Sequence, residues 1–322
     1  WMMGVAAALG LLSLRGAITP ALLLLLTFLL GLGASFSFPA WYAAMPEIVP
    51  REQIPAAVAL NGASFNVARS AGPVLAGVLM ARTGPGAVFL VNAASFVGVL
   101  YTIWRWRRPP LPVAAKTGFR RQTAEGFRAT FGNPVVRAVM VQVSLYGLSA
   151  AALWALLPAV ARHELRLSGS MYGMLLGCVG AGATAGVLAL PRLRALVDVE
   201  RLPMLGFLGF ATTLFVLGST RALFPIGAAL VLAGVSWMTI GTTFISTVQM
   251  ATSGELQGRV ISVYLLVALA GMSLGSVLWG GVASVAGTRA ALLAAGAGVL
   301  LVIPVAVVVR GRAGGWGEAR HL

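Results

Sequence analysis

The stretch "ALFPIGAALVLAGVSWMTIGTTFISTVQMATSG", residues 222–254, contains no charged side chain. A helix needs about 20 apolar residues to cross the hydrocarbon core of a bilayer, so this stretch is long enough to do so. Similar uncharged stretches are Gly16–Pro46, Thr83–Trp104, Ala138–Ala161, Leu167–Pro191, Leu202–Thr220, Val260–Thr288 and Ala290–Val309. Their repetition predicts an all-α polytopic membrane protein.

The composition of the whole chain agrees with this interpretation. Of the 322 residues, 59% are hydrophobic and only 10% are charged, whereas soluble domains average about 25% charged residues. The single cysteine, Cys178, allows no disulfide within the chain. The sequence has no GxSxG, HExxH or Walker A pattern and no Cys/His cluster, so we expect no enzyme, metal site or cofactor.

Ten transmembrane helices are expected along the chain. The predicted spans are residues 1–14, 18–44, 56–81, 86–104, 137–161, 171–190, 202–218, 222–247, 260–286 and 289–309. Trp1 lies inside an apolar segment. We therefore interpret the chain as truncated at its N-terminus and expect further helices before it.

The net charge of +15 suggests a nucleic-acid partner in a soluble protein, but here the cations lie in the predicted loops. On one side they are Arg51, Arg105, Arg107, Arg108, Lys116, Arg120, Arg121, Arg128, Arg137, Arg192, Arg194, Arg201, Arg259, Arg310, Arg312 and Arg320. On the other they are Arg15, Arg82, Arg162, Arg166, Arg221 and Arg289. The positive-inside rule places the larger set, with the central loop and the C-terminus, in the cytoplasm. We expect no nucleic-acid partner.

The long loop between the fourth and fifth spans divides the chain. We expect residues 1–104 to be the remainder of an N-terminal helical half and residues 105–136 a cytoplasmic linker loop. Residues 137–310 then form a six-helix C-terminal half, and residues 311–322 a cytoplasmic tail. Within the linker, "RQTAEGFRATF" fits a short interfacial helix and equally a solvated connector.

An internal repeat relates the two halves. At an offset of 203 residues, Gly72 corresponds to Gly275 and Gly77 to Gly280. This offset pairs the third predicted span with the ninth, which fits two six-helix halves repeated in parallel.

Three stretches resemble the major facilitator superfamily, in particular its branch of bacterial enterobactin exporters and macrolide-efflux-like proteins. They are "MPEIVPREQIPAAVALNGASFNVARSAGP" (residues 45–73), "AEGFRATFGNPVVR" (residues 124–137) and "GELQGRVISVYLLV" (residues 254–267). The resemblance implies two helical halves and transport by alternating access. The superfamily's Gly/Asp/Arg-rich loop is absent and would precede Trp1.

Residues 59–77 resemble the superfamily's antiporter motif, and Gly72, Pro73 and Gly77 match it. Ala68, Gly72 and Ala76 recur every four residues and form a stripe that lets helix backbones approach closely in lipid, and Pro73 permits a kink. The resemblance implies a gating contact and export, with Gly275 and Gly280 as the counterparts in the repeat. Ordinary tight packing is the alternative.

Arg69 is the charged residue expected inside a span, where insertion costs about 2.5–3.5 kcal/mol. Asn61 and Asn66 lie on the same predicted helix, and we expect an acidic partner on the missing helices. A structural arginine bonded to backbone carbonyls is the alternative. The second span resembles the fourth-helix motif linked with proton coupling at Gly31 and Gly33, but Thr27 replaces its arginine, which puts proton coupling at that site in doubt.

The resemblance also implies a substrate cavity between the halves. Its candidate residues are Phe36, Phe38, Trp41, Gln142, Tyr146, Trp154, Trp237, Thr243 and Phe244. Amphipathic aromatics suit a large, weakly polar ligand. The alternative for each aromatic residue is contact with lipid or the membrane interface.

These patterns together predict a monomeric secondary active transporter of the inner membrane. We expect it to export small amphipathic compounds, drug-like or siderophore-like, driven by an ion gradient with protons as the coupling ion. Uptake of a metabolite by the same fold is one alternative, and a non-transporting membrane scaffold or receptor is another.

Overall fold

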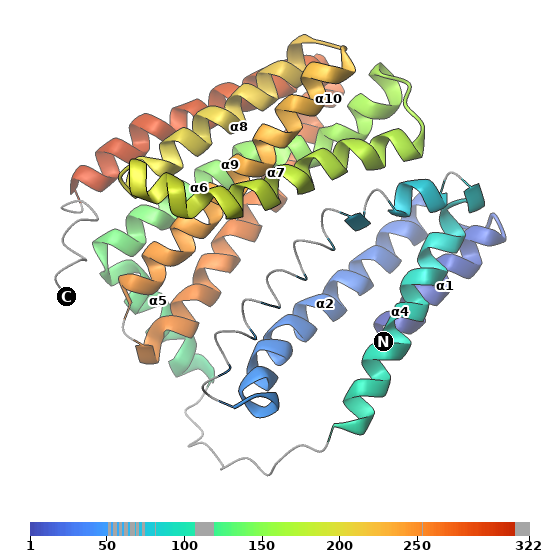
Figure 1. The fold of residues 1–322 in the computed structure, drawn as a ribbon, viewed down its shortest axis with the longest axis horizontal. Coiled ribbons are helices and arrows are strands. Elements are labelled where there is room, and N and C mark those ends of the chain that lie inside the picture. Colours follow the sequence, from blue (N-terminus) through green and yellow to red (C-terminus); the bar gives the residue numbers. More distant parts are fainter. Residues whose placement is uncertain are drawn as a thin grey trace. The chain divides into compact units, whose positions relative to one another are not determined.

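The computed structural model describes residues 1–50, 71–72, 75–80, 82–106, 119–252 and 254–312, and the single residues Gln53, Ala57, Leu60, Ser64 and Ala68. The chain divides into two compact units. The first comprises Trp1–Ala114 and Ser168–Met174, and the second comprises Ala115–Leu167 and Leu175–Leu322. The regular secondary structure in the described residues is entirely helical (Figure 1).

Seven helical segments in the described residues are long and apolar enough to cross a membrane: Pro20–Ser37, Pro85–Arg105, Pro134–Glu164, Gly169–Leu196, Leu202–Ser219, Leu223–Met250 and Leu256–Gly311. The last of these covers two predicted spans. Gly287 separates the two, since its backbone angles are non-helical, with a positive φ of 85°. The predicted span 56–81 lies largely outside the described residues. The count of ten helices therefore stays a prediction, whereas the all-helical membrane architecture is confirmed.

The first unit contains α1 (Met2–Leu14), α2 (Pro20–Ile48) and α4 (Pro85–Arg105). Small residues set the packing of α1 on α4, because a side chain at Gly86 would meet the Leu14 side chain at 2.7 Å. Against α2, the Trp1 Nε1 donates to the Leu29 carbonyl at 3.0 Å. Gly33 lies against this N-terminal end of α1, since an added Cβ would lie 2.6 Å from the Met2 Cγ.

The second unit contains α5 (Phe119–Gly132), α6 (Pro134–Ala159), the short π-helical turn η2 (Val160–Glu164), most of α7 (Gly169–Leu196), α8 (Leu202–Ser219), α9 (Leu223–Met250) and α10 (Gly254–Arg312). Helix α6 begins before the expected residue 137. Asn133 caps it, accepting hydrogen bonds from the backbone of Val135 at 2.9 Å and Val136 at 3.2 Å. Pro134 occupies the first helical position, where its missing N–H is not needed.

Glycines bring the helices of the second unit into backbone contact. A side chain at Gly182 of α7 would collide with the Val231 carbonyl of α9, and one at Gly234 of α9 would collide with the Val179 carbonyl of α7. Helix α10 crosses α6 in the same way, since a Cβ at Gly271 would lie 2.9 Å from the Ser144 carbonyl. Association in lipid depends on such close packing, because no hydrophobic drive acts between helices there.

Candidate substrate site

Six aromatic side chains of the second unit form a continuous group, called here the aromatic cluster: Tyr146 and Trp154 from α6, Phe207 and Phe210 from α8, and Trp237 and Phe244 from α9. These three helices pack together in the second unit (Figure 1). The Tyr146 ring is central, with centroids 5.3 Å from Phe207, 5.4 Å from Phe210 and 5.8 Å from Trp237. The sequence predicted that Tyr146, Trp154, Trp237 and Phe244 share a site, and these four residues belong to the aromatic cluster.

The aromatic cluster is closed at its centre and partly open at one edge. Tyr146 is 4% exposed, and the phenylalanines of the cluster are fully buried. Trp154 and Trp237 are half-buried and meet edge to face with centroids 5.8 Å apart. A flat aromatic ligand that displaced this tryptophan pair would therefore reach the Tyr146 ring.

Three polar atoms in and beside the cluster are buried without a hydrogen-bond partner in the described part of the chain: Tyr146 Oη, Trp154 Nε1 and Thr243 Oγ1. A buried polar group without a partner costs about 1–3 kcal/mol. Such groups are uncommon in folded proteins and point to a water, an ion or a ligand that the fold accommodates. These atoms supply two hydroxyls and one N–H donor, which suits a neutral ligand bearing oxygen or nitrogen acceptors.

Gln142 lies one turn from Tyr146 but is engaged elsewhere. Its Nε2 donates to the Ala138 carbonyl at 3.0 Å, and its Oε1 accepts from Arg310 Nη2 at 2.6 Å. Arg310 also donates to the Glu200 carbonyl, which ties the end of α10 to the loop before α8. The sequence pattern placed Arg310 among the loop cations. In the structure Arg310 lies within α10 and is only 4% exposed. The buried amide of Gln142 provides one of the acceptors that hold the Arg310 guanidinium there.

The remaining aromatic candidates lie in the first unit. Phe36 is 73% exposed and Trp41 is 51% exposed, both on α2. The side chain of Phe38 is outside the described residues. The aromatic cluster is thus built entirely by the second unit, and a contribution of α2 to the site stays a prediction.

The residues predicted to act in gating, and the polar residues predicted on the same helix, fall into two groups. Pro73 and the three polar residues predicted to lie inside the membrane, Asn61, Asn66 and Arg69, are outside the described residues. Of the others, Ala68 is exposed, Ala76 is half-buried, and Gly72 has no described atom within 4 Å of an added Cβ. Gly77 is in close contact, since an added Cβ would lie 2.9 Å from the Gly169 carbonyl within the first unit.

The repeat-related glycines are packed differently from their counterparts. A side chain at Gly275 would collide with the Leu148 carbonyl of α6, whereas an added Cβ at Gly280 meets no described atom within 4 Å. The first copy is thus packed at Gly77 and open at Gly72, and the second is packed at Gly275 and open at Gly280. Gly275 serves the contact between α6 and α10 inside the second unit, and a gating role for these glycines stays a prediction.

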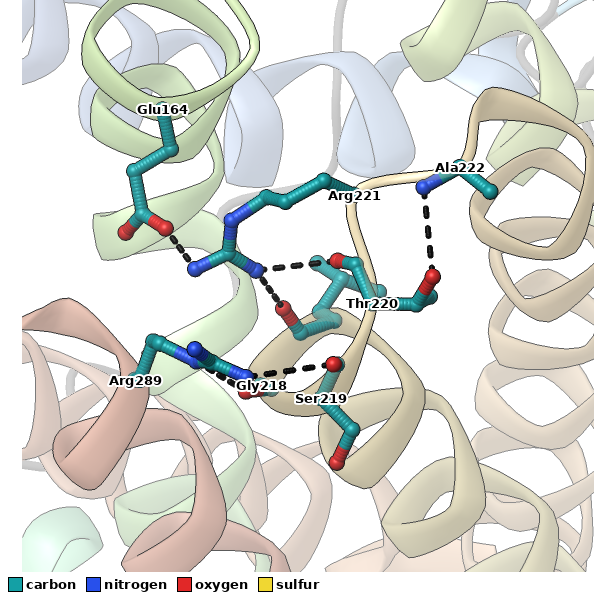
Figure 2. Close-up of polar contacts among 8 residues, drawn as sticks. Glu164, Gly218, Ser219, Thr220, Arg221, Ala222 and Arg289 are labelled. Carbon is teal, nitrogen blue, oxygen red and sulfur yellow. Dashed lines mark hydrogen bonds and ion pairs between the residues drawn. The ribbon is translucent and has the colours of Figure 1, made fainter.

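An arrangement that the sequence did not suggest is the arginine cap, defined here as Arg221 and Arg289 with Glu164 (Figure 2). Arg221 Nη1 donates to the carbonyls of Leu217 and Thr220 at 3.0 and 2.9 Å. Arg289 donates to the carbonyls of Gly218 and Ser219 at 2.9 and 3.1 Å. Together the two guanidiniums satisfy the backbone carbonyls that the end of α8 leaves without a helical partner.

The carboxylate of Glu164 completes the arginine cap by pairing with Arg221 Nη2. Burial lowers the pKa of Arg221, and the neighbouring Arg289 lowers it further. An arginine remains charged in spite of such a shift, so Glu164 offsets the repulsion between two adjacent cations. The cap thereby joins the turn after α6, the end of α8 and the part of α10 just after Gly287. Arg221 and Arg289 are among the loop cations of the sequence. Their spacing along the chain does not show that both bind the carbonyls at the same helix end.

Comparisons with known proteins agree with this architecture. A model of the transmembrane secretion effector family matches residues 1–317. The chain is 26% identical over 278 residues to the uncharacterized MFS-type transporter y4rN of Sinorhizobium fredii, covering 85% of this chain and 68% of that protein. It is also 26% identical over 295 residues to the enterobactin exporter EntS of Escherichia coli, covering 89% and 69%.

A solved structure shares the fold. It is a bacterial homologue of the human lysosomal transporter Spinster in an inward-facing, unoccupied conformation. The TM-score is 0.67 at 15% sequence identity, and the alignment covers 99% of this chain and 81% of that one. The resemblance to the major facilitator superfamily inferred from the sequence is confirmed.

Proposed function

The chain belongs to the transmembrane secretion effector family of major facilitator transporters, and from this premise we propose that it exports small, neutral, amphipathic aromatic compounds by alternating access. The observation that carries the choice of substrate is the aromatic cluster with its buried, unpartnered polar atoms. The direction of transport is supported by the similarity to an enterobactin exporter and by the partial antiporter motif at Gly72 and Gly77. Siderophore-like and drug-like compounds fall within this substrate class.

We propose protons as the coupling ion and the intramembrane Arg69 as part of the coupling machinery. Among the described acidic residues, Glu125 and Glu164 are paired with Arg259 and Arg221 near the ends of helices. Glu125 lies outside the candidate membrane spans and Glu164 is the last residue of one, so neither carboxylate lies in the middle of a span. The coupling carboxylate is therefore sought next to Arg69, as the sequence indicated.

The proposal is tested by dye accumulation in everted membrane vesicles. Nile red, a neutral aromatic dye, should accumulate in energised vesicles that contain the chain and should leave when a protonophore collapses the gradient. Accumulation in right-side-out vesicles instead would indicate the alternative, uptake. Absence of movement with Nile red and with a panel of related neutral aromatic dyes would favour a scaffold or receptor.

The substitution Tyr146→Phe tests whether the aromatic cluster binds substrate or only packs the protein core. The substitution keeps the ring and removes only the hydroxyl, which has no partner in the described part of the chain. The melting temperature should therefore stay equal or rise, because an unsatisfied buried group is lost. Dye export should nevertheless fall about tenfold, the equivalent of one hydrogen bond of about 1.4 kcal/mol to the ligand.

Thr243→Val serves as the matched second variant, since it also removes an unpartnered hydroxyl at nearly constant volume. Phe210→Leu is the control, because it alters the packing of the aromatic cluster without removing a polar atom. If both hydroxyl variants export like the wild type, the polar atoms do not bind substrate. The cluster is then core packing.

We propose that the C-terminus and the linker lie in the cytoplasm, as the loop cations predict. In a Cys178→Ser background, a cysteine at Ser219 should react with an impermeant thiol reagent added to intact cells. A cysteine at Gly118 should react only after permeabilisation. Labelling in the opposite order would reverse the orientation.

A further inference from the structure

One face of α5 is fixed to the start of α10. The carboxylate of Glu125 accepts from Arg259 Nη1 at 2.5 Å. One residue further on, a Cβ added at Gly126 would lie 3.2 Å from the Arg259 Cβ. Thr130, one turn later, is fully buried and donates to the Gly126 carbonyl at 2.8 Å. The helix is therefore held in one orientation about its own axis.

The other face of α5 carries two phenylalanines that the described residues leave partly exposed. Phe127 is 38% exposed and Phe131 is 47% exposed. Their rings stack with centroids 6.1 Å apart and an angle of 12° between the planes. Two aromatic rings held side by side and pointing outward would be costly to hydrate, so this face requires an apolar environment.

The position of α5 along the chain supplies that environment. The helix ends at Gly132, and the membrane span of α6 begins at Pro134. Its ion-pair partner Arg259 lies in the first turn of the span that begins at Leu256. Both neighbours of α5 are thus the ends of membrane spans, which places the helix at the level of the bilayer surface.

The charge of α5 indicates which kind of membrane surface the helix binds. Arg120, Arg121 and Arg128 lie on this helix, and its one acidic residue, Glu125, is paired with Arg259. Arg128 is exposed next to Phe127. A helix with aromatic residues on one side and cations beside them matches the boundary between acyl chains and anionic headgroups. An acidic protein partner would explain the arginines but not the outward pair of rings.

We propose that α5 is an anionic-lipid-binding helix, in which Phe127 and Phe131 enter the acyl boundary and Arg128, with Arg120 and Arg121, binds the headgroups of phosphatidylglycerol or a lipid of like charge. This surface is independent of what the chain transports. Because Glu125 joins α5 to α10, lipid charge acts directly on the start of a membrane span.

The test places a bimane label at Phe131→Cys in a Cys178→Ser background of the whole 322-residue chain. The chain is reconstituted in phosphatidylcholine with increasing phosphatidylglycerol. Brominated acyl chains should quench the label, and quenching should rise with the fraction of phosphatidylglycerol. Arg128→Gln should raise the phosphatidylglycerol fraction at half-maximal quenching about fivefold, as expected for one arginine at an anionic surface. Arg162→Gln, an exposed arginine of η2, is the matched control and should change nothing.

Equal quenching in pure phosphatidylcholine and in the mixtures would overturn the proposal. So would quenching by aqueous iodide alone, which indicates a solvated connector, or shielding from both quenchers, which indicates a protein or a second copy on this face. A second measurement uses no label. Phosphatidylglycerol should raise the melting temperature of the wild type in nanodiscs, and Arg128→Gln should lose that rise.

Discussion

Gly234→Leu should strongly destabilise the second unit or prevent it from folding, whereas Gly241→Leu on the same face of α9 should be tolerated. At Gly234 even a methyl group would collide with the Val179 carbonyl and the backbone of Gly182 on α7. A leucine would force the two helices apart along their whole crossing. The cost should exceed the about 1–3 kcal/mol of ordinary overpacking, because backbone cannot move aside as a side chain can.

Gly241 is two turns away and has no described atom within 4 Å of an added Cβ. The two variants therefore introduce the same side chain into the same helix, at positions two turns apart. We expect Gly234→Leu to be lost as aggregate in detergent gel filtration, or to melt about 10 °C or more below the wild type. Gly241→Leu should melt within a few degrees of the wild type. If both variants behave alike, the contact between α7 and α9 is not the one described.

The membrane spans could be predicted from sequence because the signal is compositional. A run such as residues 222–247 has no other stable environment than lipid, and α9 occurs there. Helix ends were predicted less well, since they depend on local chemistry. The Asn133 cap and Pro134 begin α6 before residue 137, and an apolar count does not detect a cap.

Glycine contacts could not be assigned from spacing alone. The stripe at Ala68, Gly72 and Ala76 has the spacing of a packing face, yet a Cβ added at Gly72 would meet no described atom within 4 Å. Gly182 and Gly234 have closer contacts, and they were not singled out because α7 and α9 both contain many small residues. Spacing shows that a helix can be approached closely, but not which partner approaches it.

The aromatic cluster shows the same division between local and long-range information. Tyr146 and Trp154 belong to one helix, and the resemblance to a known family indicated Trp237. Phe207 and Phe210 of α8 contact Tyr146, although no pattern in residues 202–219 distinguishes them from lipid-facing side chains. Such a contact depends on how α8 is rotated against α6, which is a property of the packed unit.

Arg310 and Gln142 should be strongly coupled in stability, so that removing both costs less than the sum of removing each. Gln142→Leu leaves a buried guanidinium without one of its acceptors, which should cost about 1.5–3 kcal/mol. Arg310→Met leaves the Gln142 oxygen without its donor at 2.6 Å, at about 1–3 kcal/mol. The double variant replaces both by apolar groups and should recover about 1–3 kcal/mol of the summed loss.

Thermal melting followed by tryptophan fluorescence measures this double-mutant cycle. Nile red export by the same variants shows whether Gln142 also contacts substrate. If Gln142 only holds Arg310, the double variant should be both stable and active, because the aromatic cluster is untouched. If the double variant is stable but no longer exports, the amide of Gln142 contacts substrate, as its position one turn from Tyr146 led us to expect. Additive losses of stability would contradict the bond between Arg310 and Gln142 itself.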